Sequence, residues 1–230
     1  MNVLFDLDGT LTDPQEGILA CLRHALSTVD QPIPDDDTLR LLIGPPLREG
    51  ISQLLHCPAE DPLIDAAITA YRDRFSTVGL FENHLYDGIL EALSALAEQG
   101  SLYVVTSKPR VFAERIVTHF GLNAYIQEVY GSELDGTRSD KGDLIAHALA
   151  QSNLAAAETV MVGDRRYDII GALRHQVWPV GVLWGYGSRQ ELIQAGGQQL
   201  LDHPSDLFTL RPMSDTKSEL DSPDSQPSKP

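Results

Sequence analysis

Short apolar runs alternate with amphipathic helical patterns along most of this 230-residue chain. Residues 3–5, 102–105 and 159–162 have the composition of buried strands, and residues 180–183 form a weaker fourth candidate because Pro179 precedes them. Helical faces lie between these runs: Ile89, Ala92, Leu93 and Leu96; Ala113, Ile116, Val117 and Phe120; Leu144, Ile145, Ala148 and Leu149. This alternation predicts an α/β fold of three layers, with a parallel sheet covered by helices on both faces.

One region, from about residue 14 to residue 85, breaks the alternation. It has helical patterns and no convincing strand, with two apolar faces: Ile18, Leu22, Ala25 and Val29; Ile64, Ala67, Ile68 and Tyr71. Its position directly after the first strand predicts a small helical cap over the C-terminal edge of the sheet. We therefore expect residues 1–13 and 86–211 to form a catalytic core and residues 14–85 to form the cap.

The last stretch has a different composition from the rest of the chain. Residues 212–230 are mainly Ser, Pro, Asp and Lys with almost no apolar side chains, whereas 42% of the whole chain is hydrophobic. Such a segment cannot offset its ordering entropy by burial, so we expect a disordered acidic tail.

The charge balance limits the partners of this chain. It has 33 acidic against 17 basic residues, a formal net charge of -16. A surface of that sign repels nucleic acid polymers and anionic membranes, so neither is an expected partner.

The two cysteines, Cys21 and Cys57, form no disulfide framework or metal-binding pattern, and no secretory signal or spanning segment is evident. We expect a cytoplasmic protein, either a monomer or a homodimer.

The sequence Asp6-Leu7-Asp8-Gly9-Thr10 follows the first predicted strand. Residues two apart in an extended segment point the same way, so Asp6 and Asp8 could crowd into one site. Two like charges at close range favour a hard divalent cation with oxygen ligands, most simply Mg²⁺. An acidic turn at a strand end is the alternative interpretation of this stretch alone.

Polar residues also follow the other predicted strands. They are Thr106-Ser107-Lys108, Gly163-Asp164-Arg165-Arg166-Tyr167-Asp168 and, before a helix, Ser139-Asp140-Lys141. In parallel α/β folds, sites form outside the C-terminal ends of the strands, so these groups should meet. Acids, hydroxyls and a lysine are the groups that phosphoryl transfer through a carboxylate nucleophile and a metal requires.

As a set, these motifs resemble the haloacid dehalogenase superfamily of aspartyl-phosphate phosphatases. The segment 6–10 looks like the first motif of that family, Thr106 the second, Lys141 the third, and Gly163-Asp164 with Asp168 the fourth. The likeness covers about residues 1–210, and the predicted helical insertion matches the cap of the family. It implies a Rossmann-like three-layer core and a Mg²⁺-dependent phosphomonoesterase.

The resemblance also implies a role for each motif residue. Asp6 would be the nucleophile, and Asp8 the general acid/base with its backbone carbonyl on Mg²⁺. Asp164 would be a metal ligand beside Asp6, and Asp168 would support the metal from a second layer. Two residues, Thr106 and Lys141, would bind the phosphoryl group. Ser107 flanks the site and Arg48, after the cap loop 44–47, is a candidate substrate contact.

Within the superfamily, the likeness is greatest to phosphoglycolate phosphatase-like and 5'-nucleotidase-like proteins. The stretches that carry it are 44–47, 79–83, 106–109, 131–137 and 185–187. A small phosphorylated metabolite is therefore the expected substrate. Two alternatives stay open at this point: a sugar-phosphate mutase of the same superfamily, and a phospho-accepting signalling module.

Overall fold

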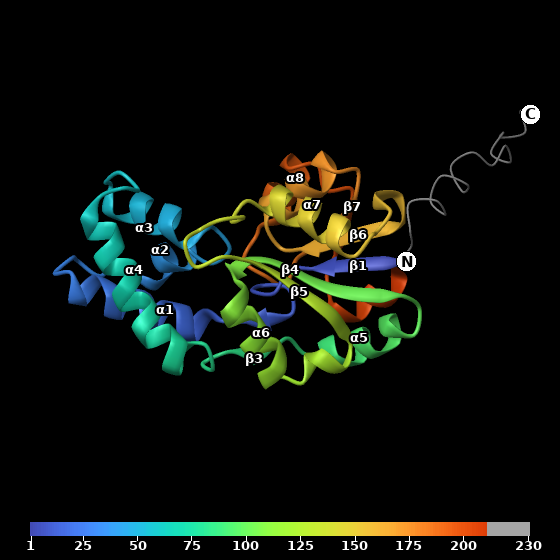
Figure 1. Ribbon diagram of the computed structural model, residues 1–230, viewed down its shortest axis with the longest axis horizontal. Helices are drawn as coiled ribbons and strands as arrows, with labels where there is room; N and C mark the ends of the chain where they lie inside the picture. Colours follow the sequence, from blue (N-terminus) through green and yellow to red (C-terminus); the bar gives the residue numbers. More distant parts are fainter. Residues whose placement is uncertain (211–230) are drawn as a thin grey trace, which may run out of the picture.

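A six-stranded parallel sheet forms the centre of the computed structural model, which describes residues 1–210 (Figure 1). The strand order is β5-β4-β1-β6-β7-β8, and all five neighbouring pairs are parallel. The strands are β1 (Asn2–Phe5), β4 (Ser101–Pro109), β5 (Ile126–Ser132), β6 (Thr159–Gly163), β7 (Trp178–Val182) and β8 (Gln199–Leu201). The α/β fold expected from the sequence is therefore confirmed.

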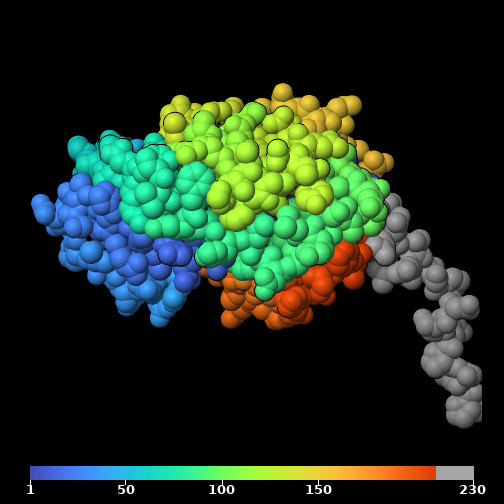
Figure 2. Space-filling model, turned by 90° about the horizontal axis from the view of Figure 1, so that it is seen from below, coloured from blue at the N-terminus to red at the C-terminus, as the bar shows by residue number. Residues whose placement is uncertain are grey.

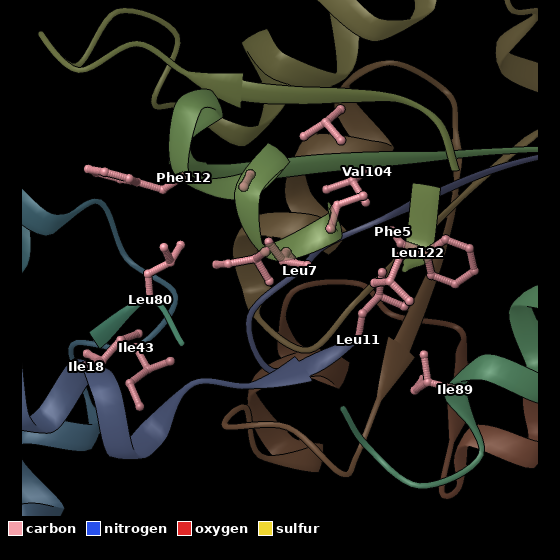
Figure 3. Close-up of a cluster of buried hydrophobic side chains, with 14 of the residues drawn as sticks. Phe5, Leu7, Leu11, Ile18, Ile43, Leu80, Ile89, Val104, Phe112 and Leu122 are labelled. Carbon is pink, nitrogen blue, oxygen red and sulfur yellow. The ribbon is translucent and has the colours of Figure 1, made fainter. Parts of the chain in front are cut away.

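Helices cover both faces of the sheet because successive strand residues point to opposite sides. On one face, Leu4 and Met161 of the sheet pack against Leu144 and Ile145 of α7 (Lys141–Gln151). Ala172 of α8 (Arg166–Arg174) belongs to the same cluster. The opposite face carries Phe5, Val104 and Val162, which pack against α5 (Ile89–Ala97) and α6 (Arg110–His119). Figure 3 shows this second cluster, which continues through Leu80 and Ile43 into the N-terminal helices. The sheet thus lies between two helical layers.

Four short helical elements also lie outside residues 14–85. They are α9 (Arg189–Gln194) and three 3₁₀ turns, Leu122–Ala124, Ala156–Glu158 and Pro204–Thr209. No helix within residues 1–210 is long and apolar enough to cross a membrane.

Two strands of the sheet, β5 and β8, were not predicted by the apolar pattern. β5 is an edge strand whose first half alternates, with Ile126 buried and Gln127 exposed, and β8 has only three residues. The weak candidate near Pro179 is a genuine strand, β7, in which Pro179 is the second residue and lies opposite Met161 of β6. A proline is tolerated near the start of a strand, where few ladder bonds are lost.

The helical elements predicted after the first strand form a bundle beside the sheet. They are α1 (Gln15–Thr28), α2 (Asp36–Arg40), α3 (Leu47–Leu55), α4 (Pro62–Arg74) and the π-helical turn η1 (Phe75–Gly79). We call residues 14–85 the cap segment. α4 packs against both α1 and α3, and Figure 2 shows these N-terminal segments, in blue and teal, gathered at one end of the molecule.

A two-stranded antiparallel pair joins the cap segment to the sheet. β2 (Thr12–Asp13) leads out of the core and β3 (His84–Leu85) leads back, with Thr12 opposite Leu85. The expectation of no strand in residues 14–85 thus missed β3, which is too short to produce a periodic pattern. The division into core and cap at residues 13 and 86 stays a prediction, and the tail predicted at 212–230 lies outside the described residues.

Candidate active site

The motif residues meet at the C-terminal edge of the sheet. Asp6 follows β1, Thr106 lies in β4, Asp164 follows β6, and Lys141 is the first residue of α7. β1 lies between β4 and β6, so the strand order changes direction at this point. Such a switch point leaves a crevice between the helices on the two faces, where open α/β sheets bind their ligands. The sequence prediction that these side chains gather at one edge agrees with this placement.

Lys141 is the centre of a buried charge network. Its Nζ lies 2.9 Å from Asp6 Oδ1 and 2.9 Å from Asp168 Oδ1, and donates a hydrogen bond of 2.9 Å to the carbonyl of Val105. Burial alone would lower the pKa of Lys141, but the charges of Asp168 and Asp6 outweigh it and raise that pKa. Lys141 therefore remains an ammonium ion that restrains the carboxylate of Asp6.

Three buried carboxylates form a group that could hold a metal ion. Asp6, Asp164 and Asp168 each offer one oxygen, and these oxygens lie within 4.8 Å of one another. Burial and the charges of Asp168 and Asp6 raise the pKa of Asp164, and burial, opposed by Lys141, raises the pKa of Asp168 to about 6. Crowded anions of this kind are stabilised by a hard divalent cation, which oxygen ligands suit.

Three glycines allow the backbone to approach Asp164 closely. An added Cβ would lie 2.4 Å from Asp164 Cβ at Gly185, 1.9 Å from the Asp164 carbonyl oxygen at Gly187, and 2.3 Å from Asp164 Oδ2 at Gly9. The N–H of Tyr186 donates to Asp164 Oδ2 at 2.8 Å. The segment 185–187 thus positions this carboxylate. In the sequence it was notable only as a family likeness, since its partner lies some twenty residues away.

Asp8 has a different environment from Asp6. Its Oδ2 lies 2.8 Å from Lys108 Nζ, and its buried Oδ1 has no hydrogen-bond partner among the described residues. Burial raises the pKa of Asp8 against the opposing charge of Lys108. The strand ends after Phe5 and the chain turns at Gly9, which has a φ of +82°, so strand alternation does not extend to Asp8. The two carboxylates are therefore held by different lysines, and the Asp8 side chain lies outside the three-acid group.

The other predicted residues, Thr106, Ser107 and Arg48, line a cavity next to Asp6 and Asp8. Thr106 is buried, and its Oγ1 accepts the N–H of Lys108 at 3.3 Å. Ser107 Oγ donates to the Ser139 carbonyl at 3.1 Å. Arg48 lies on the cavity wall, but its guanidinium is paired with Asp65 at 2.6 Å and its side chain is 45% exposed. In this structure Arg48 thus forms a surface ion pair, and it also donates to the Ala59 carbonyl.

A cavity of about 690 Å³ joins these residues to the cap segment. On the core side its lining includes Asp6, Asp8 and Thr106. On the cap side its lining includes Tyr71 and Phe75, whose stacked rings are 5.4 Å apart. Asp6, Asp8 and Thr106 therefore border a space that residues of the cap segment also line.

Arginines connect the cap segment to the core by hydrogen bonds to backbone carbonyls. Arg165, which follows Asp164, donates to the Ile43 carbonyl and is anchored by Glu191 at 2.9 Å. Arg72 of α4 donates to the Leu134 carbonyl at 2.6 Å, and Arg115 of α6 donates to the Ser76 carbonyl at 2.8 Å. These three hydrogen bonds thus fix the cap segment to the core.

Comparisons with known proteins agree with this geometry. The haloacid dehalogenase-like hydrolase family matches residues 3–182. The chain is 44% identical to a 5'-nucleotidase of Pseudomonas aeruginosa, over 91% of this chain and 93% of that protein. It is 40% identical to the tyrosine-protein kinase PtkA of Mycobacterium tuberculosis, over 91% of this chain and 70% of that protein. Phosphoglycolate phosphatases match as well, at 27 to 30% identity.

A solved structure is similar over the whole described fold. The crystal structure of a predicted phosphatase from Clostridium acetobutylicum superposes with a TM-score of 0.86 at 41% identity, covering 90% of this chain and 96% of that one. The two proteins are thus similar over nearly their full length. The chain therefore belongs to the haloacid dehalogenase-like hydrolase family and is an enzyme of the phosphatase class.

Proposed function

We propose that this phosphatase hydrolyses a small phosphate monoester through an aspartyl-phosphate on Asp6, with Mg²⁺ in the three-acid group. The observation that carries the proposal is the ion pair of Asp6 with Lys141, beside Asp164, at a point where Asp6 lines the cavity. A carboxylate that lines a cavity and is held rigidly is suited to attack phosphorus, because it loses little freedom in the reaction.

The chain's own residues can carry both half-reactions. Asp6 attacks the phosphorus and forms a P–O bond, while the bond to the leaving oxygen breaks and that oxygen takes the proton of Asp8. Thr106 and Lys141 hold the transferring oxygens. In the second half, Asp8 removes a proton from water, which attacks phosphorus and releases Asp6. A bound Mg²⁺, held by Asp6, Asp164 and the Asp8 backbone carbonyl and supported by Asp168, would offset the repulsion between carboxylate and phosphate.

The cavity has room for a metabolite larger than phosphoglycolate. Its volume of about 690 Å³ lies in the usual range for pockets that enclose a small organic ligand. The 44% identity to a 5'-nucleotidase favours a nucleoside monophosphate, with apolar and aromatic wall residues such as Ile68 and Phe75 near the base. Arg48 would turn from Asp65 to a polar group of the substrate. Such a metabolite is consistent with the expected cytoplasmic location.

A screen of phosphate esters tests this proposal. Nucleoside monophosphates, phosphoglycolate and sugar phosphates are compared by kcat/KM, each with Mg²⁺ and with a chelator. The proposal predicts turnover only with the metal, and a preference for one or more nucleotides. Equal turnover in the chelator would contradict the metal assignment, and a preference for phosphoglycolate would contradict the nucleotide.

Phosphoryl transfer to an acceptor other than water is a second candidate. It is favoured by the 40% identity to a tyrosine-protein kinase, and it includes the sugar-phosphate mutase reaction as another case. The same Asp6 intermediate would then be discharged by a hydroxyl group. Measuring released phosphate with and without added tyrosine peptide or hexose phosphate separates the two, since an acceptor would lower the yield of free phosphate only in a transferase.

A further inference from the structure

Lys108 lies between the predicted proton donor and the cap segment. Its Nζ is 2.8 Å from Asp8 Oδ2 and 4.4 Å from the centre of the Phe75 ring, and its side chain is 7% exposed. Burying an ammonium ion is costly unless it is paired. A lysine in this position, on the wall of the reaction cavity, therefore has a specific task there.

A break in the pairing of β4 with β5 aims Lys108 into the cavity. Thr106 pairs with Gly131 and Pro109 with Ser132, so Ser107 and Lys108 have no counterpart on β5. Ser132 Oγ donates to the Ser107 carbonyl at 2.8 Å, which holds the irregular segment in place. Extra residues in one strand redirect side chains, and they are common beside active sites.

The two carboxylate oxygens of Asp8 differ in their partners. Lys108 holds Oδ2, whereas the buried Oδ1 has no partner among the described residues. A carboxyl group that protonates a leaving oxygen must present the oxygen that carries the proton and keep the other one fixed. An ammonium ion on Oδ2 excludes the proton from that oxygen and leaves Oδ1 to carry it.

We infer that Lys108 is a positioning residue for proton transfer: it anchors Asp8 Oδ2 so that Oδ1 delivers the proton to the leaving oxygen. The inference rests on the proposed function, which makes Asp8 the proton donor. During the step the P–O bond to the leaving group breaks, its electron pair stays on the leaving oxygen, and the proton of Asp8 Oδ1 moves there.

Phe75 makes this anchor depend on the cap segment. Its ring belongs to η1, and the quadrupole of the ring stabilises the ammonium ion of Lys108. π-helical turns such as η1 occur often at functional sites. The orientation of Asp8 is thus complete only when the cap segment lies over the core.

A series of phosphate esters with different leaving groups tests the inference. Proton donation matters little for p-nitrophenyl phosphate, whose leaving group is stable as an anion, and greatly for alkyl phosphates. Lys108→Met keeps the length of the side chain without its charge. We expect kcat/KM of this variant to fall about 100-fold for alkyl esters and only a few fold for the p-nitrophenyl ester.

Two further variants serve as controls. Lys108→Arg restores a cation and should recover most of the alkyl activity. Arg110→Met removes an exposed cation two residues away, which pairs with Glu114 and Glu128, and should follow the wild type across the series. Phe75→Leu should show an intermediate dependence on the leaving group.

An equal loss of activity for all esters in Lys108→Met would overturn the inference, because a lysine that only binds substrate or stabilises the fold affects every ester alike. Circular dichroism and thermal unfolding show whether the variant folds. Failure of the proposed function would look different: the wild type itself would hydrolyse neither class of ester.

Discussion

Lys141 and Asp6 form a buried ion pair of 2.9 Å, with the two side chains only 4% and 7% exposed. The same ammonium group is 2.9 Å from Asp168. One cation therefore balances two members of the three-acid group, and the geometry of the predicted nucleophile depends on a residue that lies 135 positions later in the sequence.

Replacing Lys141 should destabilise the protein in a pH-dependent way. Lys141→Met leaves buried carboxylates without a counterion, which costs about 3–5 kcal/mol. Burial already raises the pKa of Asp168 to about 6 in the folded protein. Below that pH the folded protein therefore binds a proton on Asp168 more readily than the unfolded chain does. The destabilisation should be full at pH 8 and should shrink at pH 5, where the acids take up protons.

Denaturant unfolding in a chelator at the two pH values measures this difference. Lys141→Met combined with Asp168→Asn serves as the control, because removing one of the acids should restore part of the stability. A loss that is the same at both pH values would show that packing, and not charge, is responsible.

Much of the fold and of the site follows from the sequence for a simple reason. β1, β4 and β6 are buried on both faces, so they are continuous apolar runs, and a polar residue after such a run must lie at the sheet edge. This rule locates Asp6 and Asp164 without any tertiary information. Edge strand β5 and the three-residue β8 lack the continuous pattern, and they were missed.

The pairing within the site could not be predicted. Whether Asp8 contacts Lys108 or Lys141 depends on the irregular segment of β4. The contact of Tyr186 with Asp164 is made by the backbone N–H of Tyr186. A backbone donor has no signature in the residue type. Only the glycines beside it, Gly185 and Gly187, indicate that this segment lies close to another segment of the same chain.

Adding a methyl group at Gly185 should disturb the metal site. The Cβ of alanine would lie 2.2 Å from the Gly9 carbonyl oxygen and 2.4 Å from Asp164 Cβ, so the loop must shift, at a cost of about 1–3 kcal/mol. We expect Gly185→Ala to need a higher Mg²⁺ concentration for half-maximal thermal stabilisation. Gly121→Ala is the control, since it meets no atom within 4 Å although φ is +69°. Unchanged Mg²⁺ dependence in Gly185→Ala would contradict the role of segment 185–187.

Removing the Arg165 side chain should loosen the cap segment. Arg165 is held by Glu191 and donates to the Ile43 carbonyl, so Arg165→Met loses a charge-assisted contact between core and cap. We expect KM to rise about 10-fold, corresponding to roughly 1.4 kcal/mol, with faster proteolysis within residues 14–85. The guanidinium of Arg166 interacts with the neighbouring Tyr167, so Arg166→Met should behave like the wild type. Equal KM values for both variants would exclude the connection.

Glu82 should stabilise the cap segment only above its titration range. It forms two hydrogen bonds with Arg74, of 2.7 and 2.8 Å, and the hydrogen bond from Arg74 lowers the pKa of Glu82 below its ordinary 4.5. A carboxylate with a lowered pKa contributes stability above its ordinary pKa, which is lost as the pH falls through the folded value. Glu82→Gln should therefore cost about 1 kcal/mol at pH 7 and less below pH 4.5.

The exposed pair of Arg40 and Asp37 offers a control for Glu82, since Asp37 is 91% exposed. Asp37→Asn should change the free energy of unfolding by no more than a few tenths of a kcal/mol. If Glu82→Gln were as stable as the wild type at pH 7, the ion pair with Arg74 would not contribute to the fold.

During turnover, Asp6 should carry the phosphoryl group. Rapid acid quenching during turnover of p-nitrophenyl phosphate with Mg²⁺, followed by peptide mass spectrometry, locates a covalent adduct directly. We expect a phosphoryl group on Asp6 in the wild type. In Asp6→Asn, once circular dichroism has shown that the variant is folded, we expect neither adduct nor turnover. An adduct on another residue, or turnover that persists in Asp6→Asn, would contradict this role of Asp6.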